Sequence, residues 1–258
     1  MPDIVLVIIF SLLGGVVSLT GGVALLTSKH RVKLAEFATA LAAGALLAAA
    51  FVDLLPEALS LATTDLATIS VMVLVGILVF FLMESLLHWF HGHRHNSQHT
   101  KSDSHKSEPV IPLLIIGDTL HNFIDGIAIA AGFMVSPVTG IIATIAVSAH
   151  EIPKEIGDFG LLLSKGMSRT KVLLVNVLSA LATVVAAVLF FIIGESVHIE
   201  IAPVLALIAG FFIYIAVSDI IPSIHHRKNR RYAIIQSAIL LAGVALVSLF
   251  IWLLRQFI

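Results

Sequence analysis

The chain contains no cysteine, and only 12% of its 258 residues are charged. The absence of cysteine excludes disulfide bonds, thiolate metal sites and cysteine nucleophiles. The charged share is about half of that in an ordinary soluble domain. With a net charge of −1, the chain also lacks the basic surface that a nucleic acid would need. These absences exclude an ordinary soluble enzyme, a disordered chain and a nucleic-acid-binding protein.

Apolar residues, by contrast, are abundant: 59% of the chain is hydrophobic and the mean hydropathy is +1.06. A soluble fold cannot bury that share and still cover itself with polar groups. A membrane-spanning helix needs roughly 20 apolar residues, and the predicted spans are residues 4–27, 34–58, 69–91, 110–134, 138–163, 172–194, 201–223 and 232–256. The sequence therefore predicts one all-α, polytopic membrane domain with eight transmembrane helices in a lipid bilayer.

The basic residues predict the orientation of these spans. Of the 15 lysine and arginine residues, 13 lie in the first, third, fifth and seventh connections between spans. Lysine and arginine are enriched in cytoplasmic loops. We therefore expect these four connections in the cytoplasm and both termini outside. Two cations do not follow this pattern: Arg255 at the outer end of the last span, and Lys154 inside the fifth span.

The second and seventh spans share a sequence pattern. It consists of a glycine, eight residues, an aspartate, two aliphatic residues and a proline, and it occurs as Gly44–Asp53–Pro56 and as Gly210–Asp219–Pro222. The two spans run in opposite directions, as expected for an inverted-topology repeat of a transporter. We predict a 3+2+3 arrangement, in which spans 1–3 match spans 6–8 and spans 4 and 5 lie between them.

Ionisable residues are concentrated in the fourth and fifth spans. A charged group at the bilayer centre costs about 2.5–3.5 kcal/mol on insertion scales, yet these two spans contain Asp118, His121, Asp125, His150, Glu151, Lys154, Glu155 and Asp158. A turn at Ser136 and Pro137 makes the two spans antiparallel neighbours. At 1.5 Å per residue, both histidines lie roughly 16–18 Å from the span ends, in the middle of the membrane.

Two imidazoles and several carboxylates at one depth form a ligand set for a borderline divalent cation. Such a set suits Zn²⁺, with Mn²⁺, Fe²⁺, Co²⁺ or Cd²⁺ as alternatives, and is less suited to Mg²⁺ or Ca²⁺. A purely structural explanation is internal ion pairing, with Lys154 neutralising Asp125 or Glu151. The number of titratable groups favours the metal site.

These residues fall in two motifs, HNFIDG at 121–126 and HEIPKEIGD at 150–158. They closely resemble the fourth- and fifth-helix signatures of the ZIP (Zrt/Irt-like) family of divalent metal transporters, particularly its LIV-1-like branch. The runs at 176–180 and 214–216 resemble further family features. The resemblance covers all eight predicted spans. It implies the topology predicted above, the 3+2+3 inverted repeat and passage of Zn²⁺ or similar ions into the cytoplasm.

In family members the fourth and fifth helices build a binuclear metal centre. By motif position, the resemblance implies one metal held by His121, Asp125 and His150, and a second involving Asn122, Glu151 and a polar group such as Asn176. Lys154 departs from the family pattern, which has histidine or an acid there. A protonated ammonium has no lone pair for a metal. We therefore hypothesise that Lys154 takes the place of the second metal and leaves a mononuclear site.

Other polar residues are predicted to modulate the second site or the ion pathway. They are Lys154, Glu155, Asp118, Asp158, Asp53 at the entrance and Asp219 near the inner end. The cytoplasmic loop 91–109 is histidine-rich, and such tracts bind metal loosely. Its histidines are His91, His93, His95, His99 and His105. The alternative for this loop is a solvated linker with incidental metal affinity.

The sequence thus predicts import of divalent transition metals, Zn²⁺ foremost, by alternating access, without enzymatic activity. One alternative is an intramembrane zinc metalloprotease, because His150-Glu151 resembles the start of the His-Glu-x-x-His motif; Lys154 replaces its second histidine. Another alternative is a metal sensor that does not transport. The short loops favour a bacterial inner (plasma) membrane, and the resemblance implies a homodimer.

Overall fold

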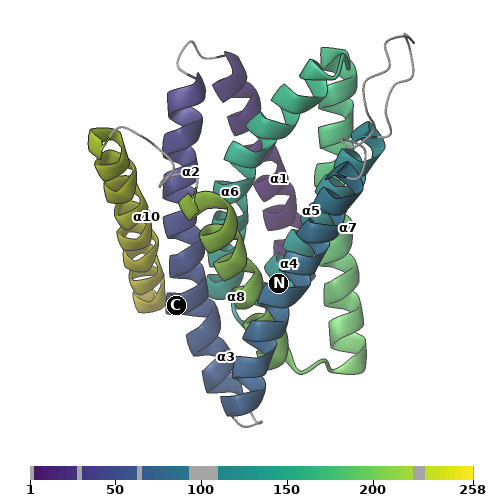
Figure 1. The fold of residues 1–258 in the computed structure, drawn as a ribbon. Coiled ribbons are helices and arrows are strands. Elements are labelled where there is room, and N and C mark those ends of the chain that lie inside the picture. The colour runs from purple at the N-terminus through teal and green to yellow at the C-terminus, as the bar shows by residue number, and fades with distance from the viewer. Residues whose placement is uncertain (1–2, 28–30, 63–65, 93–109, 223–229, 258) are drawn as a thin grey trace.

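The computed structural model describes residues 3–27, 31–62, 66–92, 110–222 and 230–257, and every element in this part of the chain is helical (Figure 1). The helices are α1 (Asp3–Thr27), α2 (Arg31–Ala48), α3 (Leu55–Leu61), α4 (Leu66–Gly92), α5 (Val110–Val135), α6 (Pro137–Ser164), α7 (Arg169–Val197), α8 (Ile201–Tyr214) and α10 (Arg230–Phe257). Two π-helical segments, η1 (Ala49–Leu54) and η2 (Ile215–Ile220), continue α2 and α8. The predicted all-α fold is confirmed.

Six of these helical stretches are long and apolar enough to cross a membrane. Helix α1 has a shorter apolar stretch, Ile4–Thr20. Helix α6 is 28 residues long but carries the ionisable residues of the fifth predicted span. The structure thus supports a polytopic membrane protein, and the count of eight spans stays a prediction.

The inverted repeat has a structural counterpart in the two π-helical segments. η1 begins five residues after Gly44, and η2 begins five residues after Gly210. Each glycine also allows a close helix contact: a Cβ atom at Gly44 would collide with the Leu240 carbonyl of α10, and one at Gly210 with the Val73 carbonyl of α4. The second and seventh predicted spans therefore share the same backbone irregularity and the same kind of neighbour.

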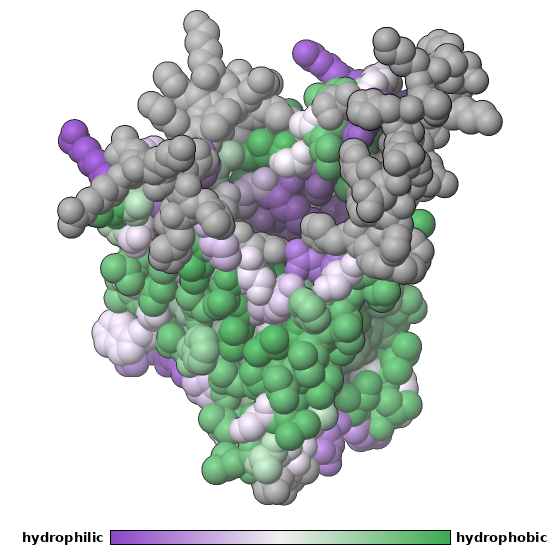
Figure 2. Space-filling view, viewed as in Figure 1, coloured by the Kyte–Doolittle hydropathy of each residue, from purple (hydrophilic) through white to green (hydrophobic). Residues whose placement is uncertain are grey.

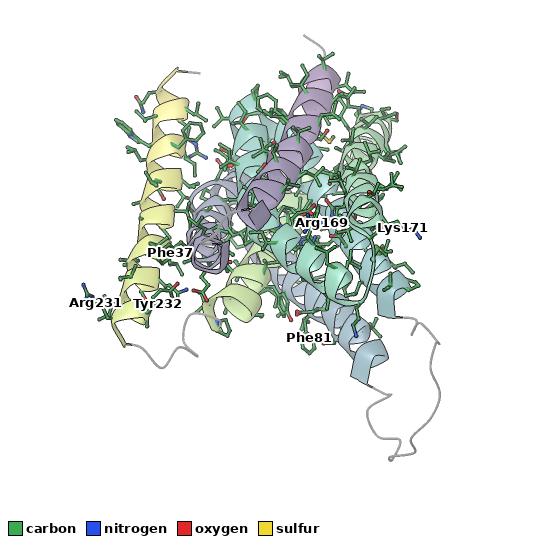
Figure 3. All side chains as sticks on the ribbon, turned by 90° about the horizontal axis from the view of Figure 1, so that it is seen from above. Phe37, Phe81, Arg169, Lys171, Arg231 and Tyr232 are labelled. Atoms are coloured by element: carbon green, nitrogen blue, oxygen red, sulfur yellow. The ribbon has the colours of Figure 1, made fainter. Side chains whose placement is uncertain are left out.

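The helix contacts define two groups, which meet where α2 packs on α6. In the first group α5 packs on α7 and α6, and α1 packs on α6 and α7. In the second group α10 packs on α2, and α4 packs on α8. Figure 3 shows the α2–α10 contact from above, where Phe37 stacks on Tyr232 with ring centroids 5.8 Å apart. The α5–α6 pair thus does not lie alone between two repeats, because α1 and α7 pack around it.

The side chains separate into a small-residue interior and an apolar surface. Alanine is the commonest buried hydrophobic residue in the described part of the chain, which lets helix backbones approach closely. Large aliphatic residues are exposed along α4, α7 and α10. Figure 2 shows this apolar exterior on its visible side, with hydrophilic residues gathered in a hollow near the end where α4 ends and α5 begins. The sequence analysis predicts that this end faces the cytoplasm.

Candidate metal centre

A tight connection between α5 and α6 positions the candidate site. Ser136 caps the N-terminus of α6, because its hydroxyl accepts a hydrogen bond from the Thr139 backbone N–H, and Pro137 occupies the first helical position. Proline at that position and serine as the N-cap are favoured for physical reasons: proline has no N–H to leave unpaired, and serine satisfies an otherwise free N–H. The two helices are therefore antiparallel neighbours, as predicted.

Four side chains from these helices converge on one point. We call His121 and Asp125 of α5 and His150 and Glu151 of α6 the four-ligand cluster. One donor atom from each residue lies within 4.8 Å of the other three.

The separations within the cluster fit a single metal ion. The two Nε2 atoms are 3.2 Å apart. Asp125 Oδ2 lies 3.4 Å from His150 Nε2 and 3.8 Å from His121 Nε2. Glu151 Oε1 lies 3.4 Å from His121 Nε2 and 3.8 Å from His150 Nε2. Tetrahedral ligands about 2 Å from Zn²⁺ are about 3.3 Å from one another, so the four atoms need only small movements to bind one ion.

Burial and hydrogen bonding prepare these atoms for a cation. The side chains of Asp125, His150 and Glu151 are 2–3% exposed, and that of His121 is 12% exposed. His150 Nδ1 lies 3.0 Å from the Ala146 carbonyl oxygen. A proton on Nδ1 donates to that carbonyl and leaves the lone pair of Nε2 for a metal. Asp125 Oδ2 is buried, has no hydrogen-bond partner among the described residues, and lies beside the Nε2 atoms of both histidines.

Lys154 does not belong to this cluster but borders it. Its Nζ atom lies 2.5 Å from Asp118 Oδ1 and 2.8 Å from Glu151 Oε1. The sequence analysis considered Asp125 or Glu151 as its partner, and the structure shows Glu151 together with Asp118. The Lys154 ammonium therefore lies beside the four-ligand cluster and contacts one of its members, Glu151.

The two asparagines that the resemblance assigned to a second metal lie outside the cluster. Asn122 donates from Nδ2 to the carbonyl and carboxylate oxygens of Asp118 and to Ser179 Oγ, and its Oδ1 accepts from Thr183 Oγ1. Asn176 donates to the Val172 carbonyl. The resemblance assigned Glu151 to the second metal, but the structure places it with His121, Asp125 and His150, the residues assigned to the first.

Three further acids of α5 and α6 lie near Lys154 or towards the end of α6. Asp118 and Asp158 line a small cavity of about 10 Å³ together with Asn176, which is room for about one water molecule. Glu155 is buried, and its Oε2 atom has no hydrogen-bond partner among the described residues. These residues lie near Lys154 but do not join the four-ligand cluster.

Asp53 belongs to a separate cluster, near α3 and towards the end of the bundle opposite the hydrophilic hollow (Figure 1). We call Asp53, Glu57 and Arg255 the outer triad, because Arg255 Nη2 of α10 lies 3.0 Å from Asp53 Oδ1 and 3.0 Å from Glu57 Oε1. Asp53 is completely buried. The predicted entrance acid thus carries its own cation, which the sequence analysis did not anticipate.

Some predicted pathway residues cannot be placed. Asp219 falls in η2, but its side chain lies outside the described part of the structure. His91 falls in α4, and its side chain is likewise not described. The other loop histidines, which are His93, His95, His99 and His105, lie outside the described residues.

Sequence reasoning missed two residues that support Asn122. Thr183 and Ser179, both on α7, bind its side chain. They lie four residues apart, on one face of a helix, and both are buried. The available signal was therefore a pair of hydroxyl residues at helical spacing in an otherwise apolar span. Phe80 of α4 was also missed, and it packs its ring edge to face against His121, with ring centroids 5.3 Å apart.

Comparison with known proteins agrees with this site. A family model described as the ZIP zinc transporter matches residues 3–112 and 93–251. The chain is 38% identical over 120 residues to zinc transporter ZIP10 of Danio rerio, in a match that covers 46% of the chain and 14% of that relative. It is 38% identical over 123 residues to zinc transporter ZIP4 of Mus musculus, covering 47% and 18%.

A third relative is the metal cation symporter ZIP14 of Xenopus tropicalis, 37% identical over 145 residues, covering 53% of the chain and 31% of the relative. The chain thus matches less than a third of the length of each of these relatives. The family model, by contrast, covers almost the whole chain, and the LIV-1-like resemblance of the two motifs is confirmed. The chain belongs to the ZIP zinc transporter family.

Proposed function

We propose that this protein carries divalent transition-metal cations across a membrane into the cytoplasm, with Zn²⁺ as its main substrate and Cd²⁺, Mn²⁺ and Fe²⁺ as further candidates. The observation that carries this proposal is the four-ligand cluster: two imidazole nitrogens and two carboxylate oxygens, buried midway along α5 and α6, at separations suited to one ion. Imidazole favours Zn²⁺ and similar borderline ions over Mg²⁺ and Ca²⁺. Relatives named as zinc transporters support the same substrate.

We propose further that the cluster holds one metal ion rather than two. Lys154 Nζ already bonds to Glu151 and Asp118. A second divalent ion on Glu151 would have to displace or repel this ammonium, which offers no lone pair while protonated.

Transport would proceed by alternating access. In this proposal the ion enters past Asp53, exchanges water for the four ligands and leaves towards Glu155, Asp158 and the histidines of loop 91–109. The group of α1, α5, α6 and α7 moves as a unit against the other helices, because α1 and α7 pack on the site helices. The hydrophilic hollow in Figure 2 lies at the end where the ion would leave.

The remaining parts of the proposal concern the cellular setting. The distribution of basic residues supports termini outside the cell membrane and basic loops in the cytoplasm. We place the protein in the inner (plasma) membrane of a bacterium, as a homodimer without nucleic-acid partners. No enzymatic step is proposed, because Lys154 stands where a metalloprotease would need its second histidine.

The test is uptake of labelled Zn²⁺, Mn²⁺, Fe²⁺ and Cd²⁺ into proteoliposomes that contain the intact chain. Removing a supporting residue near a metal typically costs 10–100-fold in affinity or activity, so His150→Ala should lower Zn²⁺ uptake at least 100-fold. The matched control is His198→Asn, which replaces an exposed histidine at the end of α7. His198 has a left-handed backbone conformation with φ of 52°, which asparagine tolerates, and uptake should be unchanged.

Three outcomes would contradict the proposal. Equal uptake by the unaltered protein and His150→Ala would remove the cluster from the pathway. Tight Zn²⁺ binding without uptake would indicate a metal sensor. Cleavage of a membrane-embedded peptide substrate that depends on His150 would indicate a protease.

A further inference from the structure

A large groove runs along α6, and its lining is apolar, in contrast to the charged segment of the same helix. It has a volume of about 510 Å³ and is formed by α1, α2 and α6, three helices that lie side by side in Figure 1. Its walls include Leu13 and Val17 of α1, Ala38 and Leu41 of α2, and Ala149 of α6. Protein interiors are close-packed and leave few voids larger than a water molecule, so a groove of this size on the helix surface offers room for another molecule.

The lining excludes a polar or charged occupant. No ionisable residue lines the groove. Its two hydroxyl groups already donate to carbonyl oxygens of their own helix, Thr144 to Gly140 at 2.9 Å and Ser148 to Thr144 at 2.8 Å. A metal ion, a sugar or a nucleotide would therefore find no free donor or charge there. The groove is also separate from the four-ligand cluster, although Ala149 directly precedes His150.

The position of the groove indicates where its occupant comes from. The mouth is flanked by Leu13, Val17 and Leu41, whose side chains are 49%, 42% and 39% exposed. These residues lie in apolar stretches of α1 and α2, Ile4–Thr20 and Leu34–Leu61, and exposed apolar residues of a membrane-spanning helix contact lipid. Dry apolar cavities bind apolar molecules: an engineered cavity of about 150 Å³ holds benzene. The groove is several times larger, and the apolar molecules next to it are the hydrocarbon tails of the membrane.

We propose that this groove is a binding site for one acyl chain of a membrane phospholipid. The chain would lie between α2, in one group of helices, and the stretch of α6 that ends at the four-ligand cluster, in the other group. If the two groups move during transport, the bound chain fills the space along which they slide. This consequence rests on the proposed function, whereas the binding of the chain does not.

The test is photo-crosslinking in vesicles of phosphatidylethanolamine and phosphatidylglycerol that contain the intact protein and a phosphatidylcholine probe with a diazirine on its acyl chain. Labelled residues are mapped by peptide mass spectrometry. We expect label on the groove walls of α1, α2 and α6 to exceed that on the exposed face of α10 at least fivefold. Ala38→Trp fills the groove from α2, and Val17→Trp fills it from α1; each should reduce groove label at least fivefold.

The matched control is Ala242→Trp, which adds the same side chain to an exposed position on α10 outside the groove and should leave groove label unchanged. Two filling variants from opposite walls keep the test valid if one of them does not fold. Label no higher in the groove than on α10, or equal label in the filled variants, would overturn the proposal. So would a crosslink showing a helix of a second copy in the groove. Because the label does not require transport, a failure of metal uptake would count against the proposed function alone.

Discussion

The four-ligand cluster and the outer triad each contain two carboxylates, but a lysine or arginine pairs with both carboxylates only in the outer triad. Arg255 binds both carboxylates of the triad. In the four-ligand cluster, Lys154 reaches Glu151 but leaves Asp125 to the histidines. Leaving a buried charge unpaired is costly. The contrast teaches that acids in a membrane protein do not by themselves mark a metal site, and that a buried carboxylate beside histidines, without a lysine or arginine partner, is the stronger indication.

Removing the carboxylate that faces only histidines, Asp125, should have the largest effect. Asp125→Asn keeps the shape of the side chain but removes the charge that faces His150 and, by our proposal, the metal. Zn²⁺ affinity and uptake should fall at least 100-fold, beyond the roughly 10–100-fold loss seen for residues that only support ligands. Glu57→Gln in the outer triad is the matched change and should lower uptake no more than a few-fold. If Asp125→Asn and Glu57→Gln lowered Zn²⁺ binding, measured by calorimetry, and uptake to the same extent, the distinction between the two clusters would be wrong.

Replacing the neighbouring ammonium of Lys154 should increase the number of metal ions that the site binds. We expect one tightly bound Zn²⁺ per chain in the unaltered protein, rising towards two in Lys154→His, because an imidazole supplies the lone pair that an ammonium lacks. The metal content after dialysis and a calorimetric titration both measure this stoichiometry. Lys154→Arg keeps the positive charge and should still bind one ion. Two strong sites in the unaltered protein would refute the mononuclear proposal.

Removing the cation of the outer triad should leave its carboxylates, like Asp125, without a lysine or arginine partner. Arg255→Gln leaves completely buried Asp53 without its partner. Arg255 is 40% exposed, so solvent screening limits the loss to about 1 kcal/mol of stability. Mg²⁺, which prefers oxygen ligands, should raise the thermal unfolding temperature of this variant more than that of the unaltered protein. Arg169→Gln, at an exposed arginine at the start of α7, is the control, and an equal Mg²⁺ effect there would contradict the interpretation.

The sequence predicts much of this architecture because its signals are local. Apolar runs, the Ser136–Pro137 turn and the helical spacing of His121 and Asp125 are each set within one or two turns of chain. The same holds for the depth of His150, which follows from its distance to the end of its helix. These features depend on backbone geometry that neighbouring helices change little.

The features that could not be predicted depend on how distant helices meet. Adjacent residues on a helix differ in direction by about 100°, so the sequence places His150 and Glu151 on different stripes. Only the position of α5 shows that both side chains converge with His121 and Asp125. Arg255 and Asp53 are separated by 202 residues, and no local pattern links them. The sequence analysis did not predict the π-helical segments η1 and η2 either.

The smallest effect should come from the hydroxyl groups that hold Asn122. Thr183→Val keeps the shape of the side chain but removes the donor to Asn122 Oδ1, a hydrogen bond of 3.0 Å, at a cost of about 1 kcal/mol. Because Asn122 lies outside the four-ligand cluster, Zn²⁺ affinity should change less than twofold, while uptake falls two- to threefold as α5 and α7 lose a contact between them. If calorimetry instead showed a loss of Zn²⁺ affinity as large as that of Asp125→Asn, Asn122 would have to be counted among the metal ligands, and the boundary drawn between ligands and supporting residues would move.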